Sequence, residues 1–582
     1  MGDPELFFSE DGTPRSGRFG DIYYSPQDGL AESRAVFLQG CHLDRLWQKG
    51  GDVTILELGF GTGLNIAAVM QHWVRAGCPG HLHIFSVEAF VITRDQAAQA
   101  LANWPEIAEF AQALGEQWPR PRRGFHHMDF PQWKVSVTVA LMPVKDALLR
   151  WRGQADAVFL DGFSPAANPD MWAEDVLALV AACCRPGARL ATFTVAGAVR
   201  RGLQAAGFSV AKCPGHGRKR ERLEAVLAGE PEDAVDRPRR MAVVGAGIAG
   251  AAVARQAVLW GMEVTVFDAA PGSGASGNAA ALVTPRLDAG DNAISALYAE
   301  AFYYATELYR RLCPEAILGE GVLQCAGSAR DEDRFGRIVA QAGFVTGDLT
   351  LFAIGERADV AAACGVDLVQ APYVVPSVVV SALIGEAVVV PARVTSVAAG
   401  QVMTGDGVVY DGFDAIVVAC GDGILDLSWA GEAMALRPVR GQVEVAAGAG
   451  GLTQPVAYGG YAIPLAEGVL FGATHDREDR GCDVRTTSRD YNLAALRVAL
   501  PQVAEAVDAV AMTSRASIRV TTRDYLPVVG SVAARIYVLT GLGARGFCLA
   551  PLLARGLLAE MVGVGDPLSE EMRRMMRPER LV

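Results

Sequence analysis

Short hydrophobic runs alternate along the chain with longer stretches rich in alanine and leucine. In the first part of the chain the apolar runs are residues 53–58, 83–87 and 157–160, and after position 240 they are residues 241–244 and 263–267. Runs of this length, apolar at successive positions, are typical of strands that are buried on both faces of a sheet. Their alternation with helical stretches predicts an α/β protein with parallel sheets.

The chain of 582 residues is too long for one hydrophobic core, since cores stop growing near ~250–300 residues. A charged stretch interrupted by Pro231 and Pro238 shows no apolar period and is the best candidate for a linker. We therefore predict a first domain at residues 1–228, a linker at 229–240 and a second domain at 241–582.

The composition limits the cellular compartment and the binding partners that we expect for the protein. The net charge of −13 argues against general affinity for nucleic acid, although a local basic patch remains compatible with it. The 11 cysteines are scattered without the spacing of a metal or redox motif, which favours a reducing compartment and predicts no metal site. No apolar run approaches the ~20 residues of a membrane span, so we expect a cytoplasmic protein that does not bind membranes.

The first glycine loop follows the strand predicted at residues 53–58. Its glycines, Gly59, Gly61 and Gly63, have GxGxG spacing, whereas a dinucleotide fingerprint has GxGxxG. Glu57 before the loop suits an ammonium group better than a pyrophosphate, and Glu88 at the end of the next strand suits the two hydroxyls of a ribose. S-adenosylmethionine (SAM) has both an ammonium and a ribose and lacks phosphate, so the loop predicts a SAM site.

Asp161 ends the strand predicted at residues 157–160. Ligands of parallel sheets bind beyond the carboxyl ends of the strands, so Asp161 is expected to face the methyl group that SAM donates. The alternative is that Asp161 only caps the turn that follows, as aspartate commonly does.

A second glycine loop begins at Gly245 and has the full GxGxxG spacing. It lies between a strand and a helix, and Asp268 ends the next strand, where its carboxylate would hold an adenosine ribose. FAD is favoured over NAD because a glycine- and serine-rich turn follows Asp268 and a third glycine loop precedes a helix at residues 550–561. The residues expected to contact FAD are Gly245, Gly247, Gly250, Asp268, Ser276, Gly277, Asn278, Gly541, Gly543 and Gly546.

Several longer runs give the chain a family resemblance. Residues 60–65 (FGTGLN), 159–165 (FLDGFSP), 274–278 (GASGN), 440–442 (RGQ) and 543–546 (GARG) carry it, within a match from about residue 21 to about residue 558. The second half resembles the D-amino-acid oxidase superfamily, close to glycine and sarcosine oxidases. The whole chain resembles the bifunctional enzymes of tRNA 5-methylaminomethyl-2-thiouridine biosynthesis.

This resemblance implies a fold and two reactions. The fold would be a Rossmann-like SAM methyltransferase domain followed by an FAD domain of the D-amino-acid oxidase type, with a Rossmann-like FAD part and an α+β substrate part. The FAD domain would remove the carboxymethyl group of 5-carboxymethylaminomethyl(-2-thio)uridine at the wobble position, U34, giving aminomethyluridine and glyoxylate. The SAM domain would then methylate the amine.

The two reactions point to candidate catalytic residues. Asp161 would position the amine and stabilise the developing cation. An ordinary carboxylate is a poor base for an alkylamine, so proton acceptance by Asp161 is left open. An arginine would hold the substrate carboxylate through paired N–H donors, and Arg519, Arg523 and Arg545 are the candidates. No cysteine occurs at residues 519–524, where relatives with covalent flavin have one, so FAD is expected to bind non-covalently.

A tRNA anticodon stem-loop is the predicted partner, and a monomer is expected. Basic clusters at residues 120–123, 218–220 and 237–240 are candidates for phosphate contacts, and the second lies in a run that matches the family. Two other hypotheses remain open at this point. One is a glycine- or sarcosine-type oxidase fused to an unrelated methyltransferase, and the other is a tRNA-binding scaffold with degenerate cofactor sites.

Overall fold

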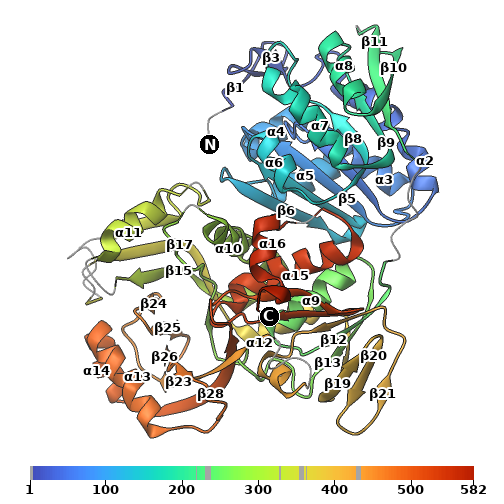
Figure 1. The fold of residues 1–582 in the computed structure, drawn as a ribbon. Helices are drawn as coiled ribbons and strands as arrows, with labels where there is room; N and C mark the ends of the chain where they lie inside the picture. Colours follow the sequence, from blue (N-terminus) through green and yellow to red (C-terminus); the bar gives the residue numbers. More distant parts are fainter. Residues whose placement is uncertain are drawn as a thin grey trace. The chain divides into compact units, whose positions relative to one another are not determined.

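The computed structural model describes residues 4–217, 219–229, 237–290, 292–326, 330–341, 343–352, 360–361, 364–427, 434–565 and 567–581. The chain divides into two units (Figure 1). The first unit is Met1–Asp236 with Val562–Ser569, and the second is Arg237–Met561 with Glu570–Val582. Most of the predicted linker, residues 230–236, lies outside the described residues. The grouping of Val562–Ser569 with the first unit has no counterpart in the sequence prediction.

The first unit is built on a mixed sheet of order β10-β11-β9-β8-β4-β5-β7-β6. Pairing is parallel from β9 through β7, and the outer strands β10, β11 and β6 run antiparallel to their neighbours. The strands of this sheet are β4 (Val53–Leu58), β5 (Leu82–Glu88), β6 (Gly124–Phe130), β7 (Val135–Leu141), β8 (Ala155–Leu160), β9 (Cys184–Thr192), β10 (Phe208–Pro214) and β11 (Glu221–Leu227). A small separate sheet contains β1 (Leu6–Phe8), β2 (Pro14–Ser16) and β3 (Asp21–Ile22).

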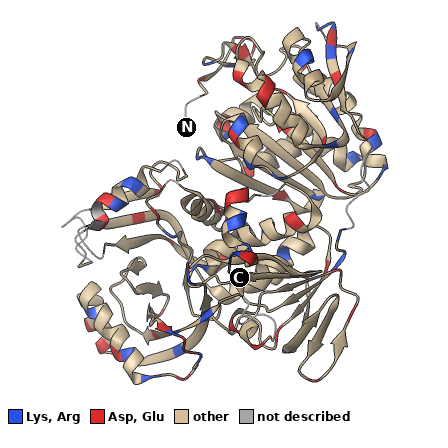
Figure 2. Cartoon of the chain, in the orientation of Figure 1, with Lys and Arg blue, Asp and Glu red and all other residues tan. Residues whose placement is uncertain are grey.

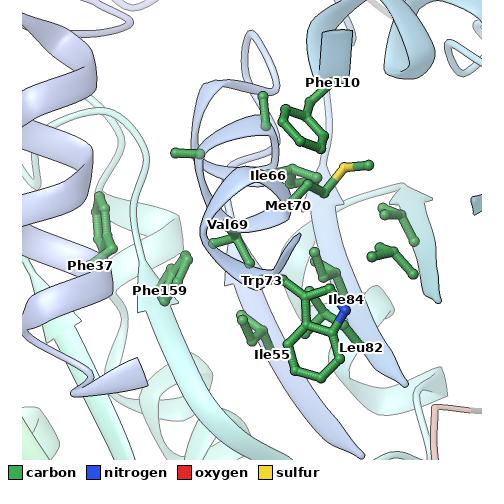
Figure 3. Packing of buried hydrophobic residues seen from close by; sticks show 14 of the residues in the cluster. Phe37, Ile55, Ile66, Val69, Met70, Trp73, Leu82, Ile84, Phe110 and Phe159 are labelled. Carbon is green, nitrogen blue, oxygen red and sulfur yellow. The ribbon is translucent and has the colours of Figure 1, made fainter. Parts of the chain in front are cut away.

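Both faces of this sheet are covered by apolar layers. Ile55 and Phe159 belong to one buried cluster, while their neighbours Leu56 and Val158 belong to the other. Side chains of a strand alternate between faces, so burial on both sides requires an unbroken apolar run. Figure 3 shows the first layer, where Trp73 of α3 lies beside Ile55 and the strands of the sheet. The helices are α1 (Gly29–Ser33), α2 (Leu43–Gln48), α3 (Leu64–Arg75), α4 (Arg94–Leu101), α5 (Ala108–Glu116), α6 (Val144–Arg150), α7 (Glu174–Ala182) and α8 (Gly197–Ala205).

The second unit contains a mainly parallel sheet of order β18-β13-β12-β22-β30-β29, in which only the edge strand β29 is antiparallel to its neighbour. Its strands are β12 (Arg240–Val244), β13 (Glu263–Phe267), β18 (Val388–Val390), β22 (Ala415–Val418), β29 (Val528–Ala533) and β30 (Ile536–Thr540). A short antiparallel sheet contains β19 (Val394–Ala398), β20 (Gln401–Thr404) and β21 (Val409–Tyr410).

A larger sheet of order β14-β17-β15-β24-β25-β26-β23-β27 completes the second unit, with β16 paired to β17 and β28 to β23. Its strands are β14 (Ala281–Leu282), β15 (Ile317–Cys325), β16 (Leu349–Phe352), β17 (Gly365–Val374), β23 (Arg437–Ala447), β24 (Val456–Ala457), β25 (Tyr461–Leu465), β26 (Gly468–Gly472), β27 (Asp476–Arg477) and β28 (Met512–Thr521). The helices are α9 (Ile248–Leu259), α10 (Ala293–Leu312), α11 (Arg330–Val339), α12 (Pro376–Ile384), α13 (Thr486–Ala499), α14 (Pro501–Asp508), α15 (Gly546–Val562) and α16 (Glu570–Met576).

One element boundary differs from the sequence expectation. The C-terminal helix, expected from residue 550, begins at Gly546, because the glycine loop leads into it directly. Within the described residues, every helix is too short or too polar to cross a membrane.

Candidate active sites

The first unit has a cavity of about 510 Å3 at the carboxyl ends of β4, β5 and β8. Gly59, Glu88 and Asp161 lie at these three strand ends, and all three line the cavity. The topology thus brings together residues that are about 100 positions apart in the sequence, in the place where ligands of parallel sheets bind.

The glycine loop after β4 needs glycine for its backbone conformation. Gly59, Gly61 and Gly63 have φ values of +97°, +51° and +77°, which L side chains rarely adopt. A Cβ at Gly59 would also lie 3.1 Å from the backbone of Gly162. Gly59 and Gly61 line the cavity, whereas Gly63 lies just before α3 and outside the lining.

Glu88 is held rigidly at the end of β5. The backbone N–H of Gly61 donates to its Oε2 at 3.0 Å, and that of Phe90 donates to its Oε1 at 2.8 Å. Burial raises the pKa of this carboxyl. Each carboxylate oxygen can accept a further hydrogen bond, so Glu88 retains the capacity to bind ribose hydroxyls.

Glu57 occupies a different place from the one expected. Its side chain is 1% exposed and lies outside the cavity lining, and it accepts a hydrogen bond of 2.6 Å from the Ser86 hydroxyl. Burial, with added repulsion from Asp161 and Glu88, raises the pKa of Glu57 to about 8. A direct contact with an ammonium group is therefore not supported, because the carboxyl has no surface on the cavity and is mostly neutral near pH 7.

Asp161 lies just after β8 and is oriented by hydrogen bonds on both oxygens. Asn65 Nδ2 donates to Oδ2 at 2.8 Å, and the Gly162 N–H donates to Oδ1 at 2.8 Å. Ser33 Oγ in turn donates to Asn65 Oδ1 at 2.6 Å, which fixes the orientation of the amide. Burial raises the pKa of Asp161 to about 6. The side chain therefore bonds to its own turn, as the capping alternative required, and also lines the cavity.

Sequence reasoning missed part of this lining. Asn65 belongs to the family-like run 60–65, but only the fold shows that it bonds Asp161. Glu32 is on a five-residue helix, and no motif marked it. Lys219, a candidate for tRNA phosphate contact, lines the cavity and pairs with Glu32 at 2.8 Å.

The second unit has a cavity of about 500 Å3 at the carboxyl ends of β12, β13, β22 and β30. The second glycine loop again depends on the absence of a Cβ. A Cβ at Gly245, which has a φ of +104°, would lie 2.5 Å from Cys420 Cα, and one at Gly250 would lie 1.8 Å from the Gly245 carbonyl oxygen. Gly247 lines the cavity, while Gly245 and Gly250 lie outside the lining and allow α9 to pack against the sheet.

Asp268 follows β13 and lines the cavity. Its Oδ2 accepts from the Ala246 N–H at 2.6 Å and its Oδ1 from the Ala270 N–H at 2.8 Å. Ser276 also lines the cavity, and its Oγ accepts from the Ile248 N–H at 3.0 Å, which ties the serine-rich turn to the first turn of α9.

The remaining predicted FAD contacts lie on two turns. Asn278 lines the cavity and accepts a 2.7 Å hydrogen bond from Arg515 Nη1. Gly277 lies outside the lining, where a Cβ would come within 2.5 Å of the Gly272 carbonyl oxygen. The C-terminal loop between β30 and α15 lines the cavity through Gly541, Gly543 and Gly546.

The three candidate arginines differ in their position relative to the cavity. Arg519 and Arg545 line the cavity, whereas Arg523 is exposed and lies outside the lining. Arg519 Nη2 donates to the Thr474 carbonyl at 2.8 Å, and Arg545 Nη1 donates to the carbonyl of Thr284 at 3.2 Å and also to its hydroxyl. Burial lowers the pKa of both guanidinium groups.

Three polar residues near Arg519 were not predicted from the sequence. Gln324, Tyr461 and His475 line the same cavity from β15, β25 and the segment after β26. They are far apart in the sequence and belong to no motif, so only the sheet pairing brings them together.

The basic clusters expected to contact tRNA are engaged within the protein to different degrees, and Arg220, Arg239 and Arg240 are exposed. Arg122 is 2% exposed and donates to the Phe125 carbonyl at 3.1 Å, and Arg123 pairs with Asp146 at 2.8 Å. Arg218 lies outside the described residues. Figure 2 shows acidic and basic residues interspersed along the chain. In the described parts of the chain, no group of three or more His, Cys, Asp or Glu side chains is arranged to bind a metal ion.

Comparisons with known proteins confirm the two cofactors. Residues 105–228 match a family described as S-adenosyl-L-methionine-dependent methyltransferase, and residues 240–561 match one described as FAD dependent oxidoreductase. The second unit also resembles the solved structure of L-proline dehydrogenase from P. horikoshii, with a TM-score of 0.50 and 16% identity over 60% of this chain and 98% of that one. This likeness shows the fold alone, and the predicted fold class is confirmed.

Curated relatives match the chain from end to end. A tRNA 5-methylaminomethyl-2-thiouridine biosynthesis bifunctional protein of Caulobacter sp. (strain K31) is 46% identical over 100% of this chain and 98% of its own length. The protein of the same description from Caulobacter vibrioides is 47% identical over 99% of this chain and 97% of its own length. The chain therefore belongs to the family of tRNA 5-methylaminomethyl-2-thiouridine biosynthesis bifunctional proteins.

Proposed function

We propose that this chain carries out two successive modifications of the wobble uridine of tRNA, each in one of its two cavities. The observation that carries the proposal is the pairing of two separate cavities, one containing Asp161 and one containing Arg519, with an end-to-end family match. The second unit removes the carboxymethyl group of 5-carboxymethylaminomethyl(-2-thio)uridine. The first unit then methylates the amine that this reaction exposes.

The residues of the second cavity fit FAD. Asp268 is suited to the adenosine ribose, and the first turn of α9 at Gly247 and Ile248 offers N–H groups to a pyrophosphate. When bound, FAD supplies a hydride acceptor for the α-carbon of the carboxymethyl group. Loss of this hydride and of the nitrogen proton leaves a C=N bond, and water then cleaves it to glyoxylate and aminomethyluridine.

Within this cavity we assign Arg519 to hold the substrate carboxylate. Its lining position beside Tyr461 and His475 gives it a polar environment, and a guanidinium can bind a carboxylate with two parallel N–H donors. Arg545 bonds both oxygens of Thr284 and is the less available of the two arginines. Arg523 lies outside the lining, so we do not assign it to the substrate carboxylate.

FAD is expected to bind without a covalent link. Cys420 lines the cavity, but burial raises the pKa of its thiol to about 12, so the reactive thiolate is scarce near neutral pH. Acid precipitation of the purified enzyme should leave the yellow flavin in the supernatant. Flavin that stays with the precipitate would contradict this expectation.

The residues of the first cavity fit SAM and an amine. Its described lining contains five carboxylates and one ammonium group, which suits a sulfonium and an alkylamine that is mostly protonated in water. When bound, SAM supplies an electrophilic methyl group. Asp161 accepts a proton from the substrate nitrogen. The lone pair of this nitrogen then forms the new N–C bond to the methyl group, while the C–S bond of SAM breaks and its two electrons stay on the sulfur. Glu88 holds the ribose.

The decisive experiment is mass spectrometry of wobble nucleosides in tRNA from a strain that lacks this protein. We expect 5-carboxymethylaminomethyl(-2-thio)uridine to accumulate and the methylaminomethyl product to disappear. An unchanged nucleoside profile, combined with rapid release of glyoxylate from free glycine without RNA, would instead favour the small-amine oxidase hypothesis.

We further propose a cytoplasmic enzyme that acts as a monomer and needs no metal. Light scattering during size-exclusion chromatography should give the mass of one chain, 61.5 kDa. Both activities should survive dialysis against a chelator, and loss of either one would contradict the metal-free proposal.

A further inference from the structure

The loop between β10 and β11 places a lysine at the methyl-transfer cavity. The loop is closed by a hydrogen bond from the Gly215 N–H to the Arg220 carbonyl at 3.0 Å, and the Lys219 N–H donates to the His216 carbonyl at 3.1 Å. Gly217 makes the turn with a φ of +58°. These bonds hold the Lys219 N–H and the Arg220 carbonyl, and the Lys219 side chain lines the cavity together with Asp161.

Two contacts hold the Lys219 side chain. Its Nζ lies 2.8 Å from Glu32 Oε1; the Glu32 side chain is 13% exposed and that of Lys219 is 46% exposed. The same ammonium lies 4.3 Å from the centre of the Phe193 ring, within the range of a cation–π contact. The exposed part of the lysine remains in solvent, but the partly buried acid and the aromatic face direct its ammonium to the cavity.

Asp161 lies in an acidic environment in which Lys219 is the exception. The side chains that act on its charge are Asn65 on α3, Lys219, Glu32 on α1 and Glu57 on β4. The other acids of the cavity lining are Asp21 on β3, Glu88 on β5 and Asp170. The positive charge of Lys219 lowers the pKa of Asp161 and the negative charge of Glu32 raises it. Among the described residues of the cavity lining, Lys219 supplies the only positive charge.

We propose that Lys219 is a positioning residue for methyl transfer, which keeps the Asp161 carboxylate ionised while Glu32 holds the lysine ammonium in place. The proposal rests on the proposed role of Asp161 as the proton acceptor. It also reassigns Lys219 from tRNA phosphate contact to the chemistry of the first unit. A neutral Asp161 would have no capacity to accept the proton that the amine loses as it is methylated.

The test compares two variants that break the same ion pair from opposite sides. In the full-length enzyme, Lys219→Met removes the positive charge and should move the acidic limb of the pH profile of methyl-transfer kcat upward by about one unit. Glu32→Gln keeps a side-chain oxygen that accepts a hydrogen bond from the lysine ammonium but removes the negative charge, so it should move the same limb downward. A purely structural ion pair would give both variants the same change. Lys212→Met is the matched control, because Lys212 pairs with Glu221 at 2.8 Å on the same hairpin but lies outside the cavity lining.

A second measurement follows the titration of the Asp161 carboxyl directly. With 13C-labelled aspartate, the carboxyl signal that is absent from Asp161→Asn should titrate at higher pH in Lys219→Met and at lower pH in Glu32→Gln, without SAM or tRNA. Displacement in the same direction, or none, in folded variants would overturn the proposal. If the wild-type enzyme fails to methylate aminomethyl tRNA, or Asp161→Asn methylates it normally, the proposed function itself fails.

Discussion

At the scale of single residues, burial is what distinguishes the acids of the first unit. Asp161 and Glu57 are both removed from water, which disfavours the charged form of a carboxyl. Asp161 keeps two hydrogen-bond donors and a nearby ammonium, so its pKa rises only to about 6. Glu57 lacks the ammonium and lies near other carboxylates, so its pKa rises to about 8. The first is ionised at neutral pH and the second is mostly neutral.

The ionised form of Asp161 gives the first prediction. Asp161→Asn should slow methyl transfer by about 10²–10⁴-fold, the usual contribution of a positioned proton acceptor, and leave SAM affinity near normal. Because the carboxylate is needed, the wild-type rate should fall as the pH drops through about 6. Quantification of tRNA nucleosides should show aminomethyluridine accumulating with this variant. A rate within a few-fold of wild type would reduce Asp161 to a turn-capping residue.

Glu57 gives a prediction about stability. Its pKa is raised in the folded state from 4.5 to about 8, so its contribution is fully present below about pH 4.5 and is lost as the pH rises through about 8. Glutamine at position 57 cannot ionise. The melting temperature of Glu57→Gln minus that of the wild type should therefore increase by at least about 2 °C from about pH 6 to about pH 9. Scanning calorimetry at both pH values provides the measurement. A difference in melting temperature that stays constant from about pH 6 to about pH 9 would show that Glu57 does not titrate in this range, which contradicts a pKa of about 8.

At the scale of elements, both cavities are built where parallel strands end and helices begin. In each unit the loop after a central strand, β4 or β12, leads into a helix, α3 or α9, and an acid ends the adjacent strand. The glycines of these loops have two different structural roles. Those with positive φ, such as Gly59, shape the loop, whereas Gly250 allows the helix to approach the strand.

Gly250→Ala tests the close approach of α9. The added methyl would meet the Gly245 carbonyl oxygen at 1.8 Å, so the loop must shift, and bound flavin measured by absorbance should fall to near zero. Methylation of aminomethyl tRNA should remain, since the first cavity belongs to the other unit. Gly336→Ala is the control, because Gly336 is also helical and a Cβ there meets nothing within 4 Å. Full flavin content in Gly250→Ala would contradict the packing argument.

At the scale of the whole molecule, one chain contains two sites with chemically successive reactions. The first unit contains the Asp161 cavity and the second contains the Arg519 cavity, and each cavity is lined from within its own unit. A substitution that inactivates one site should therefore leave the other site active, and each inactive site should leave a different nucleoside in tRNA.

Mixing two single variants tests this independence. Arg519→Met should raise KM for the carboxymethylated tRNA and leave 5-carboxymethylaminomethyl(-2-thio)uridine, whereas Asp161→Asn leaves aminomethyluridine. An equal mixture of the two proteins should restore the methylaminomethyl product on tRNA, as measured by mass spectrometry. If each variant is active in its intact half but the mixture gives no product, the intermediate must be passed within one chain.

The sequence by itself determined the two cofactors and the strands that hold them. Residues 53–58 and 263–267 were predicted as strands and form β4 and β13 with those bounds, because burial on both faces leaves a continuous apolar run. Glycine spacing and the acids Glu88 and Asp268 were also local signals. Such features depend on the chemistry of one short segment, so they are visible without the fold.

Only the tertiary structure decided which side chains share a cavity. It buried Glu57 outside the cavity lining and brought Lys219 and Glu32 to the cavity of Asp161. It also separated Arg519 from Arg523, although they are four residues apart. These outcomes depend on sheet order and on the reach of distant loops. No local pattern encodes such pairings, because the electrostatic environment of a residue is set by neighbours that are remote in sequence.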